Sequence, residues 1–276
     1  MRPLRPVRVR SLVIGEGRPA LIVPLTGADE PALLHEAQAL AGSAADLAEW
    51  RVDHLESAAA AGAPSRDGSP AGGRLAGGLG AIVSEAVRMA ARLRTALGEM
   101  PLLITVRTAQ EGGQWDLADP QYEEVLGALI RSGAADALDV EARRDPGTVR
   151  ALIAQAHAAG IPVIGSAHDF ESTPPREELV ALLRRIQDLG ADIPKAAVMP
   201  RGPGDVLALL EATWEMRSRH AEGPIITMSM GPLGAVTRVS GEIFGSAATF
   251  AAQQSASAPG QLPLEEMPAL LRALAP

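Results

Sequence analysis

IPVIGSAHDFESTPPREELVALLRRIQDLGADIPKAAVM, residues 161–199, contains a complete strand, helix and strand pattern. The runs Ile161–His168 and Ile193–Met199 are short and mainly apolar, which is typical of strands that are covered on both faces. Between them, Pro175–Leu189 has apolar residues at three- and four-residue spacing, and it begins with Pro and acidic residues as an amphipathic helix does. Two such strands joined by a helix predict a βα unit of a parallel sheet.

The same alternation extends over most of the chain. Six further runs have the character of strands: Leu21–Leu25, Asp46–Asp53, Pro101–Arg107, Ala137–Glu141, Pro224–Met230 and Phe244–Ala252. Helical patterns lie between most of them, at Glu30–Ala41, Ala81–Leu97, Pro120–Arg131, Pro146–Ala158, Asp205–Arg219, Ala235–Ile243 and Leu264–Leu274. Eight strands with crossover helices predict an α/β fold of the (β/α)8 TIM barrel class. An open doubly wound sheet is the alternative, because periodicity does not show whether a sheet closes.

Two segments lie outside the βα pattern. Val7–Ile14 is typical of an extra β-hairpin, and we expect it to form an N-terminal extension against the bottom of the barrel. Ala58–Gly80 is rich in Ala, Gly, Ser and Pro and lacks apolar periodicity, so we expect a flexible loop insertion there. Residues 1–276 as a whole are predicted to form a single barrel domain.

The composition excludes several classes of protein. The chain has 276 residues, 47% of them hydrophobic, and no Cys, which removes disulfides, thiolate nucleophiles and Cys-ligated zinc. A net charge of -8 and 3% aromatic residues argue against nucleic-acid binding. No apolar run is long enough to span a membrane, and no apolar stretch of a signal peptide follows Met1–Arg10. We therefore expect a cytoplasmic protein whose partner is a small molecule.

Lys195 is the only lysine among 25 basic residues, and it lies inside the apolar run Ile193–Met199. Arg fills every other basic position, so a requirement that Arg does not meet would explain the lone lysine. Arg stays protonated and cannot form an imine, whereas a desolvated Lys loses its proton readily. An amine nucleophile is one explanation; a lysine that simply survived a drift towards Arg is the other, and we give the two equal weight.

Other polar residues occur where strands of the predicted barrel end. Arg107 ends the third strand, Glu111 follows it in a Gly-rich loop, and His168 ends the fifth strand. Because active sites of (β/α)8 barrels lie at the C-terminal ends of the strands, we expect these side chains to converge on one pocket with Lys195. For His168, a core histidine bonded to a backbone carbonyl, or an N-cap partner to Asp169, is an equal alternative.

Charged and hydrogen-bonding groups in other segments are candidates for substrate contacts. Glu49 and Arg51 alternate along the second strand and so share one face, where an ion pair between them is an equal alternative. Arg107 and Arg238 are candidates for gripping a carboxylate, and for Arg107 an ion pair with Glu49 is the alternative. Residues 253–261 have the composition of a loop and carry Ser257 and Gln261; a lid over the pocket is one interpretation, and a connecting loop is the default.

Taken together, these segments resemble the type I 3-dehydroquinate dehydratase family. The resemblance runs in order from about Ser11 to Gln261 and is carried by Glu49–Asp53, Thr105–Arg107 with Glu111–Gly113, Ser166–Phe170, Ile193–Pro200, Pro224–Gly231 with Arg238 and Phe244–Phe250, and Ser257–Gln261. It implies a (β/α)8 barrel, a homodimer in the shikimate pathway, and catalysis without metal or organic cofactor.

The resemblance also implies residue roles. Lys195 would form a Schiff base with 3-dehydroquinate, His168 would be the general acid and base, and Glu111 would orient His168. The substrate would be held by a set of six residues, namely Glu49, Arg51, Arg107, Arg238, Ser257 and Gln261.

The sequence also departs from the family pattern at some positions. Pro24 stands where some members have a Ser that reaches a substrate hydroxyl, and Ala167 is smaller than the Asn often found before the histidine. Thr237 precedes Arg238 where Ser is common. Two other functions are alternatives: a Schiff-base aldolase, which also needs a lysine in the sixth strand, and a barrel that binds carboxylates without catalysis.

Overall fold

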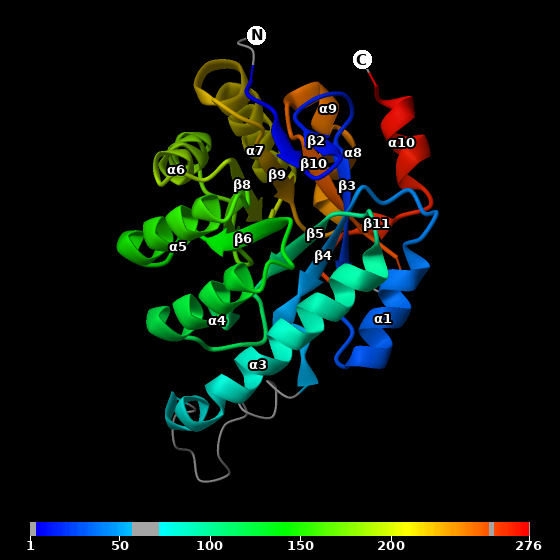
Figure 1. Cartoon of the computed structure of the whole chain (residues 1–276). Helices are drawn as coiled ribbons and strands as arrows, with labels where there is room; N and C mark the ends of the chain where they lie inside the picture. Colours follow the sequence, from blue (N-terminus) through cyan, green and yellow to red (C-terminus); the bar gives the residue numbers. More distant parts are fainter. Residues whose placement is uncertain (1–3, 57–71, 254–256, 276) are drawn as a thin grey trace.

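The computed structural model describes residues 4–56, 72–253 and 257–275, and a parallel sheet dominates it (Figure 1). The sheet strands follow one another in chain order: β3 (Ala20–Leu25), β4 (Leu47–Arg51), β5 (Leu102–Thr105), β6 (Ala137–Glu141), β7 (Val163–Asp169), β8 (Ile193–Val198), β9 (Ile226–Ser229) and β10 (Ala248–Ala252). Each of these strands except β9 and β10 pairs in parallel with the next one along the chain. The predicted βα alternation is therefore confirmed.

The sheet closes on itself. β10 pairs in parallel with β3, where Ala248 lies opposite Ala20, so the last strand of the barrel lies beside the first. Between β9 and β10 a single bridge joins Ile225 to Ser246, and the amide of Ala247 donates a hydrogen bond of 2.8 Å to the carbonyl of Ile225. A closed ring confirms the (β/α)8 barrel and excludes the open doubly wound sheet. We call the junction of β9 and β10 the seam.

Helices surround the barrel (Figure 1). The α-helices are α1 (Glu30–Ala39), α3 (Gly72–Leu97), α4 (Asp119–Arg131), α5 (Pro146–Ala158), α6 (Arg176–Asp188), α7 (Pro203–Glu215), α8 (Ala235–Val239), α9 (Gly241–Phe244) and α10 (Met267–Ala273). Short 3₁₀ turns occur at Val52–His54, Ala109–Glu111 and Pro232–Gly234, and α7 continues into a π-helical turn, Met216–His220. In α6, Leu179, Leu183 and Ile186 form the buried face, which is the amphipathic pattern that the sequence predicts.

The N-terminal hairpin closes the bottom of the barrel, as predicted. β1 (Val7–Val9) and β2 (Leu12–Ile14) are antiparallel. Val9 and Ile14 are buried in one apolar cluster with residues such as Leu47 and Ile193, which begin barrel strands. Burial of these side chains removes apolar surface from water at the end of the barrel opposite the C-terminal strand ends.

Two predictions about elements were wrong in part, and one short strand was not predicted. Of the expected loop Ala58–Gly80, residues 58–71 lie outside the described residues, but 72–80 belong to α3. Buried Leu79 and Ile82 continue the apolar stripe of this helix, and that burial outweighs the low helix propensity of its glycines. Phe244, expected to start the eighth strand, instead ends α9. The two-residue strand β11 (Leu262–Pro263), parallel to β10, has no signal in the sequence because it is too short for periodicity.

No helix in the described ranges combines the length and the apolar character needed to cross a membrane.

Candidate active site

The residues that the sequence singled out line one cavity of about 500 Å³. It contains all nine predicted site residues: Glu49, Arg51, Arg107, Glu111, His168, Lys195, Arg238, Ser257 and Gln261. Apolar side chains complete the lining, among them Phe170, Met228, Met230 and Phe250. The predicted convergence is confirmed in space, while the chemical roles of these residues remain predictions.

Lys195 points into the barrel from β8 and is 3% exposed. Its Nζ lies 3.4 Å from Oδ2 of Asp139 and 4.4 Å from the centre of the Phe250 ring. Its neighbours in the chain are apolar, as expected, but the amine itself contacts a carboxylate. The only lysine of the chain is thus a buried amine that opens onto the cavity.

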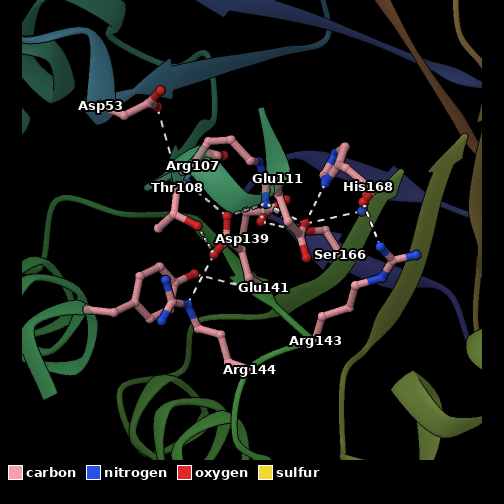
Figure 2. Close-up of polar contacts among 12 residues, drawn as sticks. Asp53, Arg107, Thr108, Glu111, Asp139, Glu141, Arg143, Arg144, Ser166 and His168 are labelled. Atoms are coloured by element: carbon pink, nitrogen blue, oxygen red, sulfur yellow. Dashed lines mark hydrogen bonds and ion pairs between the residues drawn. The ribbon is translucent and has the colours of Figure 1, made fainter. Parts of the chain in front are cut away.

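His168 contacts Glu111 through both its ring and its backbone (Figure 2). The ring Nδ1 is 2.8 Å from Oε2 of Glu111, and the backbone N–H of His168 donates to the same oxygen at 3.1 Å. The ring partner is a carboxylate, so the alternative of a core histidine bonded to a backbone carbonyl is wrong. With Nδ1 occupied, Nε2 is the ring nitrogen left for chemistry in the cavity.

Burial shifts the proton equilibria of this pair towards neutral forms. Loss of solvent, followed by the positive charges of Arg107 and Lys195, lowers the pKa of His168 well below its usual 6.5. Loss of solvent also raises the pKa of Glu111 to about 8, because the lowering effect of Arg107 is opposed by Glu141 and Asp139. Because the two groups share a hydrogen bond, the proton lost near pH 8 belongs to the pair.

The two glycines that follow Glu111 determine the direction of its side chain. Gly112 has a φ of 82°, and a Cβ there would lie 2.3 Å from Cε2 of Phe170. At Gly113 a Cβ would lie 2.0 Å from the carbonyl oxygen of Arg107. Only glycine fits both positions, so the Glu-Gly-Gly sequence folds back tightly and aims the carboxylate at His168.

Arg107, which lines the cavity, forms ion pairs with three carboxylates (Figure 2). Its Nη2 is 2.7 Å from Asp139, and its Nη1 is 3.2 Å from Glu141 and 3.4 Å from Glu111. Burial alone would lower the pKa of Arg107, but these negative charges outweigh it and raise the pKa well above the usual value of an arginine. The alternative ion pair with Glu49 is wrong, because the carboxylates that Arg107 binds are those of Asp139, Glu141 and Glu111.

Asp139 and Glu141 were missed by the sequence analysis. Both are buried and lie on β6, separated by one residue. The signal was present, since two carboxylates that alternate with apolar residues in a five-residue buried strand must share a face and need cationic partners. The run Ala137–Glu141 was recognised only as a strand.

Glu49 and Arg51 do not pair with each other. Oε1 of Glu49 accepts a hydrogen bond of 2.8 Å from Oγ1 of Thr105, whereas Arg51 binds Asp53 through two bonds of 2.8 and 2.7 Å. Opposing the effect of burial, Arg51 lowers the pKa of Asp53 below 3.8. Glu49 and Arg51 therefore reach the cavity as separately anchored groups.

Arg238 is a buried cation for which the described residues supply no carboxylate. It is 1% exposed; its Nη2 donates to the carbonyl of Pro259 at 2.9 Å, and its Nη1 lies 3.6 Å from Sδ of Met228. Its Nε has no hydrogen-bond partner among the described residues. Burial lowers the pKa of Arg238 to about 10, yet it stays charged at neutral pH. A buried guanidinium with spare donors suits a bound anion.

Residues 257–261 cover one side of the cavity. The backbone N–H of Ser257 donates to the side chain of Gln261 at 2.9 Å, and Nε2 of Gln261 donates to Oγ of Ser257 at 3.0 Å. Gly260 has a φ of 77°, and a Cβ there would lie 2.2 Å from the carbonyl oxygen of Gly231. The N–H of Gly231 in turn donates to Pro259, so this segment is fastened to the loop after β9.

The charged groups of the cavity are not arranged as a metal site: within the described parts of the chain, no three His, Cys, Asp or Glu side chains are placed to hold an ion together.

Comparisons with known proteins agree with this geometry. The family model for type I 3-dehydroquinase matches residues 21–275. The 3-dehydroquinate dehydratases of Klebsiella pneumoniae subsp. pneumoniae and Bacillus licheniformis are 42% and 41% identical, over 95% and 97% of both chains. A crystal structure of type I 3-dehydroquinate dehydratase from Clostridium difficile with covalent modified comenic acid has a TM-score of 0.88 at 38% identity, covering 99% of this chain and 98% of that one. The fold, the cavity and these similarities together place the chain in the type I 3-dehydroquinase family.

Proposed function

We propose that this enzyme converts 3-dehydroquinate to 3-dehydroshikimate and water through an imine on Lys195. The observation that carries the proposal is a single buried lysine amine in the same cavity as a carboxylate-anchored imidazole. Membership of the family supports the dehydratase activity. The similar structure from Clostridium difficile, which contains covalent modified comenic acid, supports a covalent mechanism for this chain.

The first step joins the amine to the substrate. The neutral amine of Lys195 attacks the C3 ketone, and loss of one water gives a protonated imine. The imine nitrogen can accept an electron pair, which makes the neighbouring C2–H bond acidic. A buried amine is suited to this step because Arg, the other basic residue of the chain, cannot form an imine.

His168 moves the proton in the second step. Nε2 of its neutral imidazole takes a proton from C2, and the electron pair passes through the new C2–C3 double bond to the nitrogen. The pair then returns, the C1–O bond breaks, and His168 gives its proton to the departing hydroxyl as water. Glu111 keeps the ring in place and binds its Nδ1 side throughout. Hydrolysis of the product imine consumes the water released at imine formation, so the net reaction releases one water.

Substrate binding uses the other charged and polar groups of the cavity. Arg238 is suited to the C1 carboxylate because its guanidinium has no carboxylate partner among the described residues. Glu49 and Arg51 are anchored by Thr105 and Asp53 and can meet ring hydroxyls. Ser257 and Gln261 reach the cavity from the covering segment, and Arg107 lines it while bound to three carboxylates.

The direct test is incubation of the enzyme with 3-dehydroquinate, with the conjugated enone product followed by its ultraviolet absorption. Addition of borohydride should leave a reduced adduct on Lys195, which mass spectrometry of the peptides identifies. A retro-aldol fragment on the same lysine would instead indicate an aldolase. Binding of the substrate with neither turnover nor adduct would indicate a barrel that only binds carboxylates.

Replacement of Arg238 should weaken substrate binding without lowering the stability of the protein. We expect Arg238→Gln to lower kcat/KM about 10- to 150-fold, because a hydrogen bond to a charged group contributes about 1.5–3 kcal/mol. The loss should lie mainly in KM. The free energy of unfolding should stay the same or increase, because the substitution removes a buried charge that no carboxylate neutralises among the described residues.

Arg238→Lys is the control for this variant, because it keeps the charge and should recover part of the lost affinity. Steady-state kinetics and thermal melts of both variants provide the measurements. Equal losses in the two variants, or an unchanged KM in Arg238→Gln, would exclude a carboxylate contact.

The Glu111 and His168 pair predicts how activity depends on pH. Below about pH 8 the carboxyl of Glu111 is protonated and donates to Nδ1, which leaves the proton of the ring on Nε2, where it blocks the base. Above that pH the carboxylate draws the ring proton to Nδ1 and frees Nε2. We therefore expect kcat/KM to rise as pH increases through about 8.

Glu111→Gln should be slower and should lose this rise, because the amide does not titrate. A pH profile of kcat/KM for both proteins is the measurement. If the same rise persisted in the variant, the ionisation would belong to another group.

The resemblance also leads us to propose a homodimer and a cytoplasmic location. Sedimentation of the purified protein tests the first proposal, and fractionation of the source cells tests the second.

A further inference from the structure

Asp139 is a buried carboxylate for which the proposed mechanism has no role so far. It lies in the middle of β6 and is 0% exposed. β6 and β8 are separated by β7, and side chains from alternate strands of such a barrel share one layer of its interior. Asp139 and Lys195 meet in this layer, where Oδ2 is 3.4 Å from Nζ.

The direction of the Asp139 carboxylate is fixed by two other residues. Its Oδ1 accepts hydrogen bonds from Nη2 of Arg107 at 2.7 Å and from Oγ of Ser166 at 2.6 Å. Figure 2 shows Asp139 between Arg107 and Ser166. With Oδ1 held in this way, Oδ2 is turned towards the amine.

Asp139 carries a permanent negative charge. Burial alone would raise its pKa, but Arg107 and Lys195 outweigh burial and leave the pKa of Asp139 below 3.8. At neutral pH it is therefore an ionised acceptor and does not take a proton from its neighbours. Its effect on the lysine nitrogen is electrostatic, and it favours whichever form of that nitrogen is positive.

We propose that Asp139 is the counter-ion of the Lys195 nitrogen during catalysis, accepting a hydrogen bond from the ammonium form and again from the protonated imine. This inference rests on the proposed function for its catalytic meaning. In the imine, the carboxylate keeps the N–H proton in place, so the nitrogen can accept the electron pair released from C2. In the free enzyme, the same charge stabilises the ammonium form of the lysine, which cannot attack the ketone. Asp139 thus opposes the first step and favours the second.

Reductive methylation of the lone lysine tests the counter-ion without any use of 3-dehydroquinate. Formaldehyde with cyanoborohydride methylates only neutral amines, and mass spectrometry separates the Lys195 peptide from the chain terminus. At neutral pH, Asp139→Asn should be methylated about tenfold faster than the wild type or more, since an opposite charge at this distance changes a protonation equilibrium by at least about that factor. An unchanged rate would overturn the proposal.

Glu141→Gln is the matched control. Glu141 lies on the same strand and contacts the same Arg107, but Thr108 holds it through two bonds of 2.8 Å, away from Lys195. In Glu141→Gln, Lys195 should be methylated at nearly the wild-type rate. A rate equal to that in Asp139→Asn would instead mean that disruption of the ion pairs of Arg107 causes the effect, and it would overturn the proposal. Ser166→Ala keeps the charge of Asp139 and removes one bond that aims it. An intermediate rate in this variant supports the proposal even if Asp139→Asn does not fold.

Single turnovers with 3-dehydroquinate test the catalytic meaning. In Asp139→Asn, borohydride should trap the imine on Lys195 as fast as in the wild type or faster, whereas release of the enone should be about tenfold slower or more. A purely structural role for Asp139 would slow both steps together and would overturn the proposal. If the wild type forms no adduct at all, the proposed function fails, and the methylation rates still decide whether Asp139 is the counter-ion.

Discussion

Lys195→Met should abolish dehydration of 3-dehydroquinate. The substitution removes the only side-chain amine of the protein, so no imine can form and no electron sink develops next to C2. Loss of a covalent nucleophile costs on the order of 10⁶-fold in rate where it has been measured, so we expect kcat to fall by at least about 10⁴-fold. Ultraviolet assays for the enone and mass spectra after borohydride give the two readouts.

Lys195→Arg is the informative companion to this variant. It keeps a positive charge opposite Asp139, so the ion pair and the fold should be better preserved than in Lys195→Met. Because a guanidinium does not form an imine, we expect it to be as inactive as the methionine variant. Thermal melts establish that both proteins are folded. Turnover at the wild-type rate in either variant would exclude the covalent mechanism.

His168→Ala should separate imine formation from elimination. The amine of Lys195 is unchanged, so 3-dehydroquinate should still attach to it, whereas no imidazole remains to take the C2 proton. Positioned acid and base catalysis contributes about 10²–10⁴-fold, so elimination should slow by about this factor and the imine should accumulate. Rapid quenching with borohydride followed by mass spectrometry measures the adduct, and enone absorption measures the elimination.

The chain contains a matched histidine for comparison. His157 lies 2.8 Å from a carboxylate oxygen of Asp192, the same distance as in the His168 and Glu111 pair, but on the outer surface in α5. His157→Ala should turn over normally. If His168→Ala eliminated water at the wild-type rate, the base would have to be another group in the cavity.

Much of the fold could be predicted because each strand is short, apolar and followed by a helical pattern. Ala137–Glu141 and Pro146–Ala158 match the observed β6 and α5 residue for residue. Closure could not be predicted, because it depends on pairing between β10 and β3, which are far apart in the chain. The start of α3 was missed because local glycines favour a loop, and only the tertiary burial of Leu79 shows otherwise.

The site was predicted from residue types that are unusual in their surroundings. A lone lysine in an apolar strand and a histidine at a strand end are visible in the sequence. The partners of these side chains are not visible in the sequence. Nothing local indicates that Arg107 binds Asp139 rather than Glu49, because the two acids lie on β6 and β4, which both pair with β5, the strand that Arg107 follows. The choice is made by side-chain direction in three dimensions. Asp139 and Glu141 could have been noticed from their alternation along a buried strand, but their partner could not.

The seam has fewer backbone hydrogen bonds than the other strand junctions of the described barrel. His168 and Lys195 lie on β7 and β8, which pair over six residues, so backbone hydrogen bonds fix the distance between them. Arg238 and residues 257–261 border β9 and β10, where one bridge joins the strands. Backbone groups with few shared bonds open at a low free energy. We therefore expect amide hydrogen exchange to be faster at this junction than along β7 and β8.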